Sequence, residues 1–396
     1  MQNALDISDQ RGLLWLMAIA CGLCAGTNYY CQPLIGSIQA DYLVAESLVA
    51  FTVTIAQVSY ALGLLLIVPL GDIVNKTKFI PLLMLFAAIG LFISATASHI
   101  YLLWLGTFIA GLFSVAAQVL IPFATMAVKP EKTGQVIGFL MSGLLVGILL
   151  STSLAGLLSA LWHWQAIYML SATLMLVLAG LLKSRLPYLL RLKMSYASIF
   201  VSMAQLVRQE HRLVLRALIG ACCFAAMSIL FSTIALLLGQ APFELSELWI
   251  GLITLVGVFG ALSSSQLGKV ADRGATQLLT CIGLITLAIS WGLLYLGQQQ
   301  LWCYILGYAV INLGLAMVHT ANQAIVFRLR PDAKSRINAI YMTSYFIGGA
   351  AGSALGVYAW QQGGWSMSCM VGISLIGMAT VIALMDRYQI KIHPAI

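Results

Sequence analysis

The polar side chains best suited to chemistry lie in one apolar stretch of the second half of the chain. His319 and Gln323 follow Asn312 by seven and eleven residues, so the three share one face of a helix. Asn322 adjoins this face. An imidazole has an unperturbed pKa near ~6.5 and changes charge near neutral pH. His319 is therefore a candidate to carry a proton, and the alternative is a hydrogen-bonded packing residue.

Further amides, hydroxyls and phenols recur at helical spacing in other apolar stretches. Several form i, i+4 pairs, which place two side chains on one helix face. A neutral wall of this kind suits a neutral, cationic or amphipathic solute of modest size. Each residue also suits hydrogen bonding between helices, and both interpretations stay open. The candidate cavity residues are Asn28, Gln32, Gln57, Tyr60, Gln118, Ser228, Asn312, His319, Asn322, Gln323, Tyr341 and Tyr345.

Ionic, metal and nucleotide sites are not indicated by the sequence. The 12 carboxylates all fall outside the expected membrane spans, and no Lys or Arg is expected in the middle of one. An interior without a cation suits a dianionic solute poorly. Cys21 and Cys24 form a CxxC, but outer metal ligands are not apparent, so packing is the interpretation. We expect no cofactor, no metal and no enzymatic activity, and ATP-driven transport is disfavoured because no nucleotide motif is present.

The elements that position these residues must be membrane-spanning helices. Of the 396 residues, 61% are hydrophobic and only 8% are charged, against roughly 25% charged in soluble domains. A spanning helix needs ~20 mostly apolar residues. The expected fold is therefore all-α and integral to a membrane, with twelve transmembrane helices. The spans are predicted at 12–38, 48–70, 79–97, 100–128, 136–161, 166–182, 217–239, 249–271, 277–297, 301–327, 337–360 and 367–385.

The charges fix the expected orientation. All 20 Lys and Arg residues lie in loops on one side of this arrangement, at their edges, or in the termini. The opposite loops carry Asp41, Glu46, Glu244 and Glu247 instead. The positive-inside rule then predicts a multi-pass protein of the inner (plasma) membrane with both termini in the cytoplasm. We expect no nucleic-acid partner, because the cations spread along one membrane face and do not form a patch. The protein is expected to be a monomer in a lipid bilayer.

The chain contains an internal repeat at an offset of 200–201 residues. Asp72 in the first copy is equivalent to Asp272 in the second, and Gln118 is equivalent to His319, at matching points of the predicted topology. Each copy has an even number of spans, so the copies are parallel and related by a pseudo-two-fold axis along the membrane normal. We expect an N-terminal six-helix bundle at 1–182, a basic cytoplasmic linker at 183–216 and a C-terminal six-helix bundle at 217–396. Substrate is expected between the copies, near the midplane.

The sequence resembles the major facilitator superfamily over nearly its whole length. The run Gly268-Lys269-Val270-Ala271-Asp272-Arg273 is similar to that family's loop motif, and Asp72 with its trailing cations forms a degraded first copy. The resemblance implies the major facilitator fold and a cytoplasmic gate closed by loop contacts. A solvated loop charge is the alternative. The gate residues are Asp72, Lys76, Lys78, Asp272 and Arg273.

Within the superfamily the chain resembles the bacterial drug:proton antiporters that export drugs, sugars or nucleosides. The runs from Asn28 to Pro33 and from Tyr60 to Leu65 carry this resemblance. Two positions depart from the pattern, since Thr107 stands where the group has arginine and Ile148 where it has proline.

The expected function is export of a small organic solute by alternating access, with proton antiport implied by the resemblance. Two alternatives stay open: a symporter or uniporter for uptake, and a transport-inactive membrane sensor or partner protein that keeps the fold.

Overall fold

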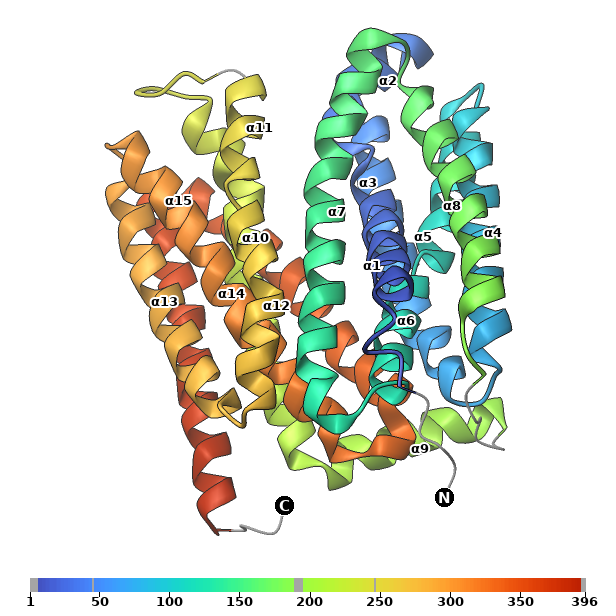
Figure 1. Cartoon of the computed structure of the whole chain (residues 1–396). Helices are drawn as coiled ribbons and strands as arrows, with labels where there is room; N and C mark the ends of the chain where they lie inside the picture. Colours follow the sequence, from blue (N-terminus) through green and yellow to red (C-terminus); the bar gives the residue numbers. More distant parts are fainter. Residues whose placement is uncertain (1–5, 45, 189–194, 246, 393–396) are drawn as a thin grey trace. The chain divides into compact units, whose positions relative to one another are not determined.

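The structure is a computed structural model, and it describes residues 6–44, 46–188, 195–245 and 247–392. Within these ranges every regular element is helical and none is a strand. The long helices lie alongside one another as bundles (Figure 1). Lipid offers no hydrogen bonds to the backbone, and a helix satisfies its own amides and carbonyls. The all-α membrane fold predicted from hydropathy is therefore confirmed.

The described chain contains fifteen α-helices and five 3₁₀ turns. Two of the turns, η1 and η2, follow the first helix at Thr27–Tyr29 and Gln32–Leu34. In chain order, the elements are α1 Arg11–Gly26, α2 Ile35–Tyr42, α3 Glu46–Leu66, η3 Val68–Asp72, α4 Lys76–Ala95, α5 Ile100–Phe113, α6 Ala116–Met126, α7 Thr133–Leu161, α8 Gln165–Arg185, α9 Tyr196–Gln209, α10 His211–Leu238, α11 Glu247–Leu255, α12 Val258–Asp272, α13 Thr276–Leu296, α14 Leu301–Leu329 and α15 Lys334–Ile392.

The helical stretches account for twelve spans if α11 and α12 are counted as one span and α15 as two. By length and hydropathy, ten stretches of the described chain are sufficient to cross a membrane. One of these, Pro331–Tyr388, contains most of α15, which is interrupted at Gly363 and Gly364 and so holds two spans. Gly364 has φ +61, a left-handed conformation that glycine adopts without steric cost. The short helices α11 and α12 together cover the predicted span 249–271.

Two predicted boundaries fall short of the helices that the structure contains. The seventh span was predicted to begin at residue 217, but α10 begins at His211. The twelfth was predicted to end at residue 385, but α15 continues to Ile392. Sequence analysis ended both spans at a charged residue, Arg216 and Asp386. Arg216 and Asp386 therefore both lie in helices.

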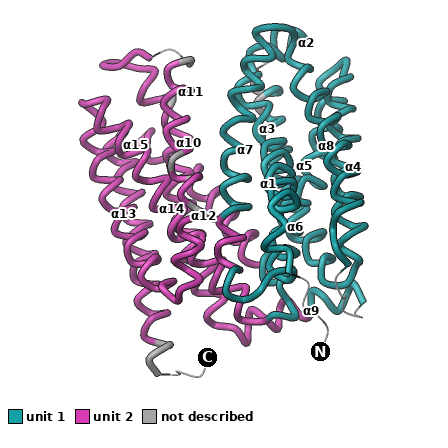
Figure 2. Tube along the Cα trace, viewed as in Figure 1, with its two compact units in different colours: residues 1–132, 139–201, 331–339 teal, residues 133–138, 202–330, 340–396 magenta. Residues whose placement is uncertain are grey.

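The chain divides into two compact units, which Figure 2 distinguishes by colour. Unit 1 consists of residues 1–132, 139–201 and 331–339, and unit 2 of residues 133–138, 202–330 and 340–396. In unit 1, α4 packs against α5 and α8, and α1 packs against α6 and α8. In unit 2, α14 packs against α10, α12 and α13. The division into bundles at 1–182 and 217–396 with a linker between them stays a prediction.

Glycines set the closest helix contacts inside each unit. In unit 1, a Cβ added to Gly147 of α7 would lie 2.2 Å from the Cα of Gly22 in α1. In unit 2, a Cβ on Gly352 of α15 would lie 2.1 Å from the carbonyl oxygen of Ala225 in α10. Backbones in lipid gain van der Waals packing by approaching this closely, and only glycine leaves the room.

We expect Gly147→Ala to destabilise unit 1, because its new methyl group would overlap the backbone of α1. Overpacking of this kind costs about 1–3 kcal/mol, which thermal unfolding of the purified protein in detergent would show as a lower midpoint. Gly156→Ala is the matched control in the same helix, since nothing lies within 4 Å of a Cβ there. Equal midpoints for the two variants would contradict the close contact.

Candidate functional site

His319 is buried in unit 2 within a cluster of aromatic side chains. Its Nδ1 lies 3.0 Å from the hydroxyl oxygen of Tyr341, a hydrogen bond whose direction depends on the imidazole tautomer. The ring of Tyr345 lies 4.9 Å from the imidazole, and Phe224 stacks on Tyr345 with their ring centroids 4.1 Å apart. The i, i+4 spacing of Tyr341 and Tyr345 on α15 places both phenols beside His319. The structure thus joins three predicted site residues into one group.

The remaining predicted residues of α14 take different partners. Asn312 donates to the backbone oxygen of Tyr308 over 2.8 Å and packs against glycines of α12. Gln323 is fully buried, with its Nε2 3.9 Å from the sulfur of Met342. Asn322 is fully buried and contacts Arg216. The residues of the predicted helix face therefore do not form one site. Asn312 makes a packing contact, whereas His319 belongs to a buried polar group.

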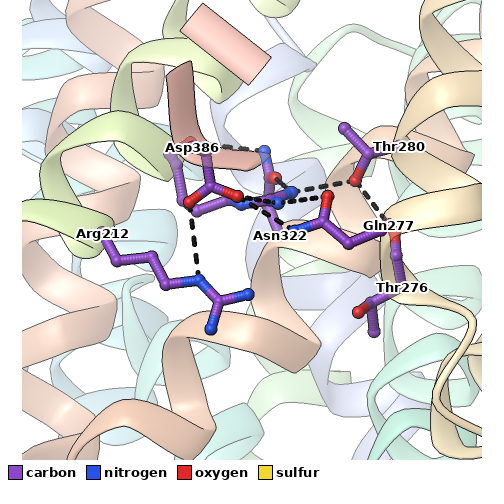
Figure 3. Close-up of polar contacts among 7 residues, drawn as sticks. Arg212, Thr276, Gln277, Thr280, Asn322 and Asp386 are labelled. Atoms are coloured by element: carbon purple, nitrogen blue, oxygen red, sulfur yellow. Dashed lines mark hydrogen bonds and ion pairs between the residues drawn. The ribbon is translucent and has the colours of Figure 1, made fainter. Parts of the chain in front are cut away.

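A buried ion pair, which sequence analysis missed, lies next to Asn322. Arg216 of α10 and Asp386 of α15 are 0% and 1% exposed, and the Nη2 of Arg216 donates to the Oδ2 of Asp386. Arg216 also donates through Nη2 to Gln277 over 2.9 Å, and through Nη1 to Thr280 over 2.8 Å and to Asn322 over 3.2 Å. The pair thus connects α10, α13, α14 and α15, as Figure 3 shows for its labelled partners.

The expectation that all charges stay outside the buried helical interior is therefore wrong for these two residues. The physical reason is mutual neutralisation, because each charge has its opposite within hydrogen-bond range and further polar partners around it. Arg212, one turn before Arg216, lies 3.4 Å from the Oδ1 of Asp386, and its side chain is 21% exposed. The sequence feature that could have indicated this site is the i, i+4 pair of Arg212 and Arg216 directly before an apolar run. Asp386, the one carboxylate after the last run, could have been matched to it.

Unit 1 contains two neutral hydrogen-bonded pairs at the predicted cavity residues. The Nδ2 of Asn28 donates to the hydroxyl of Ser114 over 3.2 Å, and the Nε2 of Gln118 donates to the hydroxyl of Tyr60 over 3.2 Å. Asn28 lies in a short 3₁₀ turn, η1, where α1 is interrupted. Gln118 is the repeat equivalent of His319, so the repeat places a neutral amide in one unit and an imidazole in the other.

A small cavity lies beside Asn28, with room for about one water molecule. Its walls include Ser94 of α4 and Thr107 of α5, the position where the antiporter group has arginine. The Oδ1 of Asn28 and the hydroxyls of Ser94 and Thr107 are buried there without a protein hydrogen-bond partner.

The other predicted cavity residues lie elsewhere. Ser228 is buried beside Gly349, Gln57 is half-buried and Gln32 is exposed.

The first loop aspartate, Asp72, binds the N-terminus of α15 inside unit 1. It accepts from the backbone amides of Ser335 and Arg336 over 3.0 and 3.2 Å, and from the Nε of Arg336 over 2.9 Å. Unpaired amides and the helix dipole favour an anion at this position. The predicted partners Lys76 and Lys78 do not supply these contacts, because Lys76 is buried against Met126 and Lys78 is exposed.

The second loop aspartate, Asp272, makes the equivalent contact inside unit 2. It accepts from the backbone amides of Gly134 and Gln135 at the start of α7, over 2.6 and 2.8 Å. Burial raises the pKa of Asp272, and these amides oppose the shift. Arg328 lies 3.3 Å from its Oδ1, whereas the predicted partner Arg273 is exposed. Both aspartates therefore bind a helix N-terminus, and a gating role for these contacts stays a prediction.

Comparison with known proteins identifies the kind of molecule that carries this site. The model of the Major Facilitator Superfamily matches residues 17–353. The chain is 41% identical over 364 residues to the uncharacterized transporter YgaY of Escherichia coli O157:H7, covering 92% of each chain. It is 23% identical over 388 residues to the inner membrane transport protein YnfM of Escherichia coli K12, covering 96% of this chain and 91% of YnfM.

Solved structures agree on the fold. The human organic anion transporter MFSD10 matches with a TM-score of 0.81 and 15% identity, over 94% of this chain and 99% of that one. The proton:xylose symporter XylE matches with a TM-score of 0.71 and 13% identity, over 94% of each chain. At this identity the likeness concerns the arrangement of helices alone.

We expect Asp72→Asn to destabilise unit 1, because it removes a carboxylate that is 4% exposed and with it the negative charge that the buried Arg336 binds. Breaking one side of a buried pair costs about 3–5 kcal/mol, which thermal unfolding would show as a lower midpoint. Lys78→Gln, an exposed charge on the next helix, is the control and should leave the midpoint unchanged. The double variant Asp72→Asn/Arg336→Gln should recover part of the loss, and a double variant as unstable as the sum of both single variants would contradict the pairing.

Proposed function

Since the chain belongs to the Major Facilitator Superfamily, we propose that it is a secondary transporter that exports a small organic solute across the inner membrane in exchange for protons. It would act by alternating access, as a monomer, without a metal or a cofactor, and with both termini in the cytoplasm. Export and proton exchange are our extension of the transporter assignment that the family and the 41% identical relative support.

The observation that carries the proton step is the environment of His319. Its imidazole is 8% exposed and is hydrogen-bonded to Tyr341. Ionisable groups buried in membrane helices are costly and usually functional. An imidazole can gain or lose a proton without leaving this bond, because the phenol can donate to the ring or accept from it. His319 therefore suits the role of proton carrier.

The groups around His319 also favour a class of solute. Phe224 and Tyr345 form a stacked aromatic wall, and Tyr341 and Tyr345 add phenol hydroxyls. Aromatic faces attract flat apolar groups and cations. Arg216 does not by itself favour an anionic solute, because Asp386 neutralises it. A neutral or cationic amphipathic compound fits this surface best.

We expect His319→Gln to abolish the dependence of transport on a pH gradient while exchange of solute continues. Glutamine keeps a hydrogen bond to Tyr341 but cannot take up a proton. Flux of a panel of drugs, sugars and nucleosides into inverted membrane vesicles, with and without a pH gradient, measures both properties. His163→Gln is the matched control, since His163 is exposed at the turn before α8.

Each other outcome identifies a different function. Unchanged pH-driven flux in His319→Gln would contradict the role of His319. Solute movement only in the opposite direction would establish the uptake alternative. An absence of flux for the whole panel would favour a membrane sensor that keeps the transporter fold.

A further inference from the structure

We propose that the buried pair of Arg216 and Asp386 sets the pH at which His319 takes up its proton. This inference rests on the proposed function, since it concerns the proton that His319 would carry. Arg216 and Asp386 would act as positioning residues that control the charge near the imidazole, without touching the solute.

Asn322 brings the pair next to the turn of α14 that carries the imidazole. The Nη1 of Arg216 donates to the Oδ1 of Asn322 over 3.2 Å, and the Nδ2 of Asn322 lies 3.3 Å from the backbone oxygen of Arg216. Asn322 stands one turn from His319 on the same helix. His319 in turn is hydrogen-bonded to Tyr341 of α15, the helix that also carries Asp386.

Burial makes this arrangement sensitive to charge. Arg216 and Asp386 are almost completely enclosed, and His319 and Tyr341 are 8% and 0% exposed. Solvent therefore screens their interactions weakly, so removing one charge of the pair should shift the titration of the imidazole by on the order of one pH unit. In the intact pair the carboxylate cancels the guanidinium, so His319 can accept a proton without strong repulsion.

The other groups near His319 do not replace this pair. Tyr341 and Tyr345 touch the ring but are neutral near pH 7. On α12 and α14, Asp272 and Arg328 neutralise each other, and Lys269 is exposed and screened. In the described part of unit 2, α14 and the helices around it carry these further titratable groups: His211, Arg212, Cys222, Cys223, Cys281, Tyr295, Cys303, Tyr304, Tyr308, Tyr358, Cys369, Arg387 and Tyr388. Arg212 alone among them joins the pair.

The proposal predicts shifts of opposite sign for the two members of the pair. Asp386→Asn leaves Arg216 and Arg212 uncompensated, which disfavours a charged imidazole and lowers the midpoint of the His319 titration by about one pH unit. Arg216→Gln leaves the carboxylate facing the polar interior and raises the midpoint. That rise should be smaller, because Arg212 still neutralises part of Asp386 (Figure 3). The double variant Arg216→Gln/Asp386→Asn should return close to the original midpoint.

The experiment is an NMR titration of the full-length protein in lipid nanodiscs, with ¹⁵N-labelled histidine. His319→Gln identifies the His319 signal among the 5 histidines. Opposite shifts with recovery in the double variant would support the proposal. Shifts of the same sign, or no shift, would overturn it, because a purely structural role disturbs the site in the same way from either side. Asp386→Glu is the matched control that keeps the charge and should keep the midpoint.

Loss of a buried partner could prevent folding, so a milder variant tests the same idea. Arg212→Gln removes the 21% exposed cation from the group and should raise the midpoint slightly. An unchanged or lowered midpoint in Arg212→Gln would count against the proposal. The titration is independent of transport, so the two proposals fail separately. Normal proton-driven flux in His319→Gln would contradict the role that the proposed function gives to His319, whereas a midpoint insensitive to Asp386→Asn would overturn this inference alone.

Discussion

A polar side chain buried among membrane helices must find its partner within the protein, because the hydrocarbon offers none. Most of the polar interior of both units follows from this constraint. Asn28 bonds Ser114, Gln118 bonds Tyr60, and His319 bonds Tyr341. The same constraint holds for charge, since Arg216 is enclosed together with Asp386. Each pairing joins different elements of the chain, so polar satisfaction and helix packing determine one another.

The fold could be predicted because hydropathy is a local property. Ten stretches of the described chain are long and apolar enough to span a bilayer. Even the division of α15 was predicted, as a gap between spans that contains Gly363 and Gly364. The errors lie at helix ends, where a charge was read as the end of a span. A helix can carry its charge inward when the opposite charge lies opposite it, and hydropathy does not contain that information.

The site could be predicted only in part, because its partners are set by long-range contacts. Helical spacing brought His319, Tyr341 and Tyr345 together, and the repeat related Gln118 to His319. Spacing did not indicate that Asp72 pairs with Arg336, 264 residues away, rather than with the nearby Lys76. Local sequence offers several cations of equal charge to each aspartate, and only the packed structure decides between them.

The two copies of the repeat have kept one fold and diverged in their electrostatics. The buried polar pairs around Asn28 and Gln118 in unit 1 are neutral, and Thr107 there replaces the arginine expected from the antiporter group. Unit 2 holds the imidazole together with a buried ion pair. A proton is bound most readily where its charge can be balanced nearby, and a neutral amide network cannot adjust its charge. In the proposed function, this divergence would assign the proton to unit 2 and leave the neutral pairs of unit 1 to recognise an uncharged part of the solute.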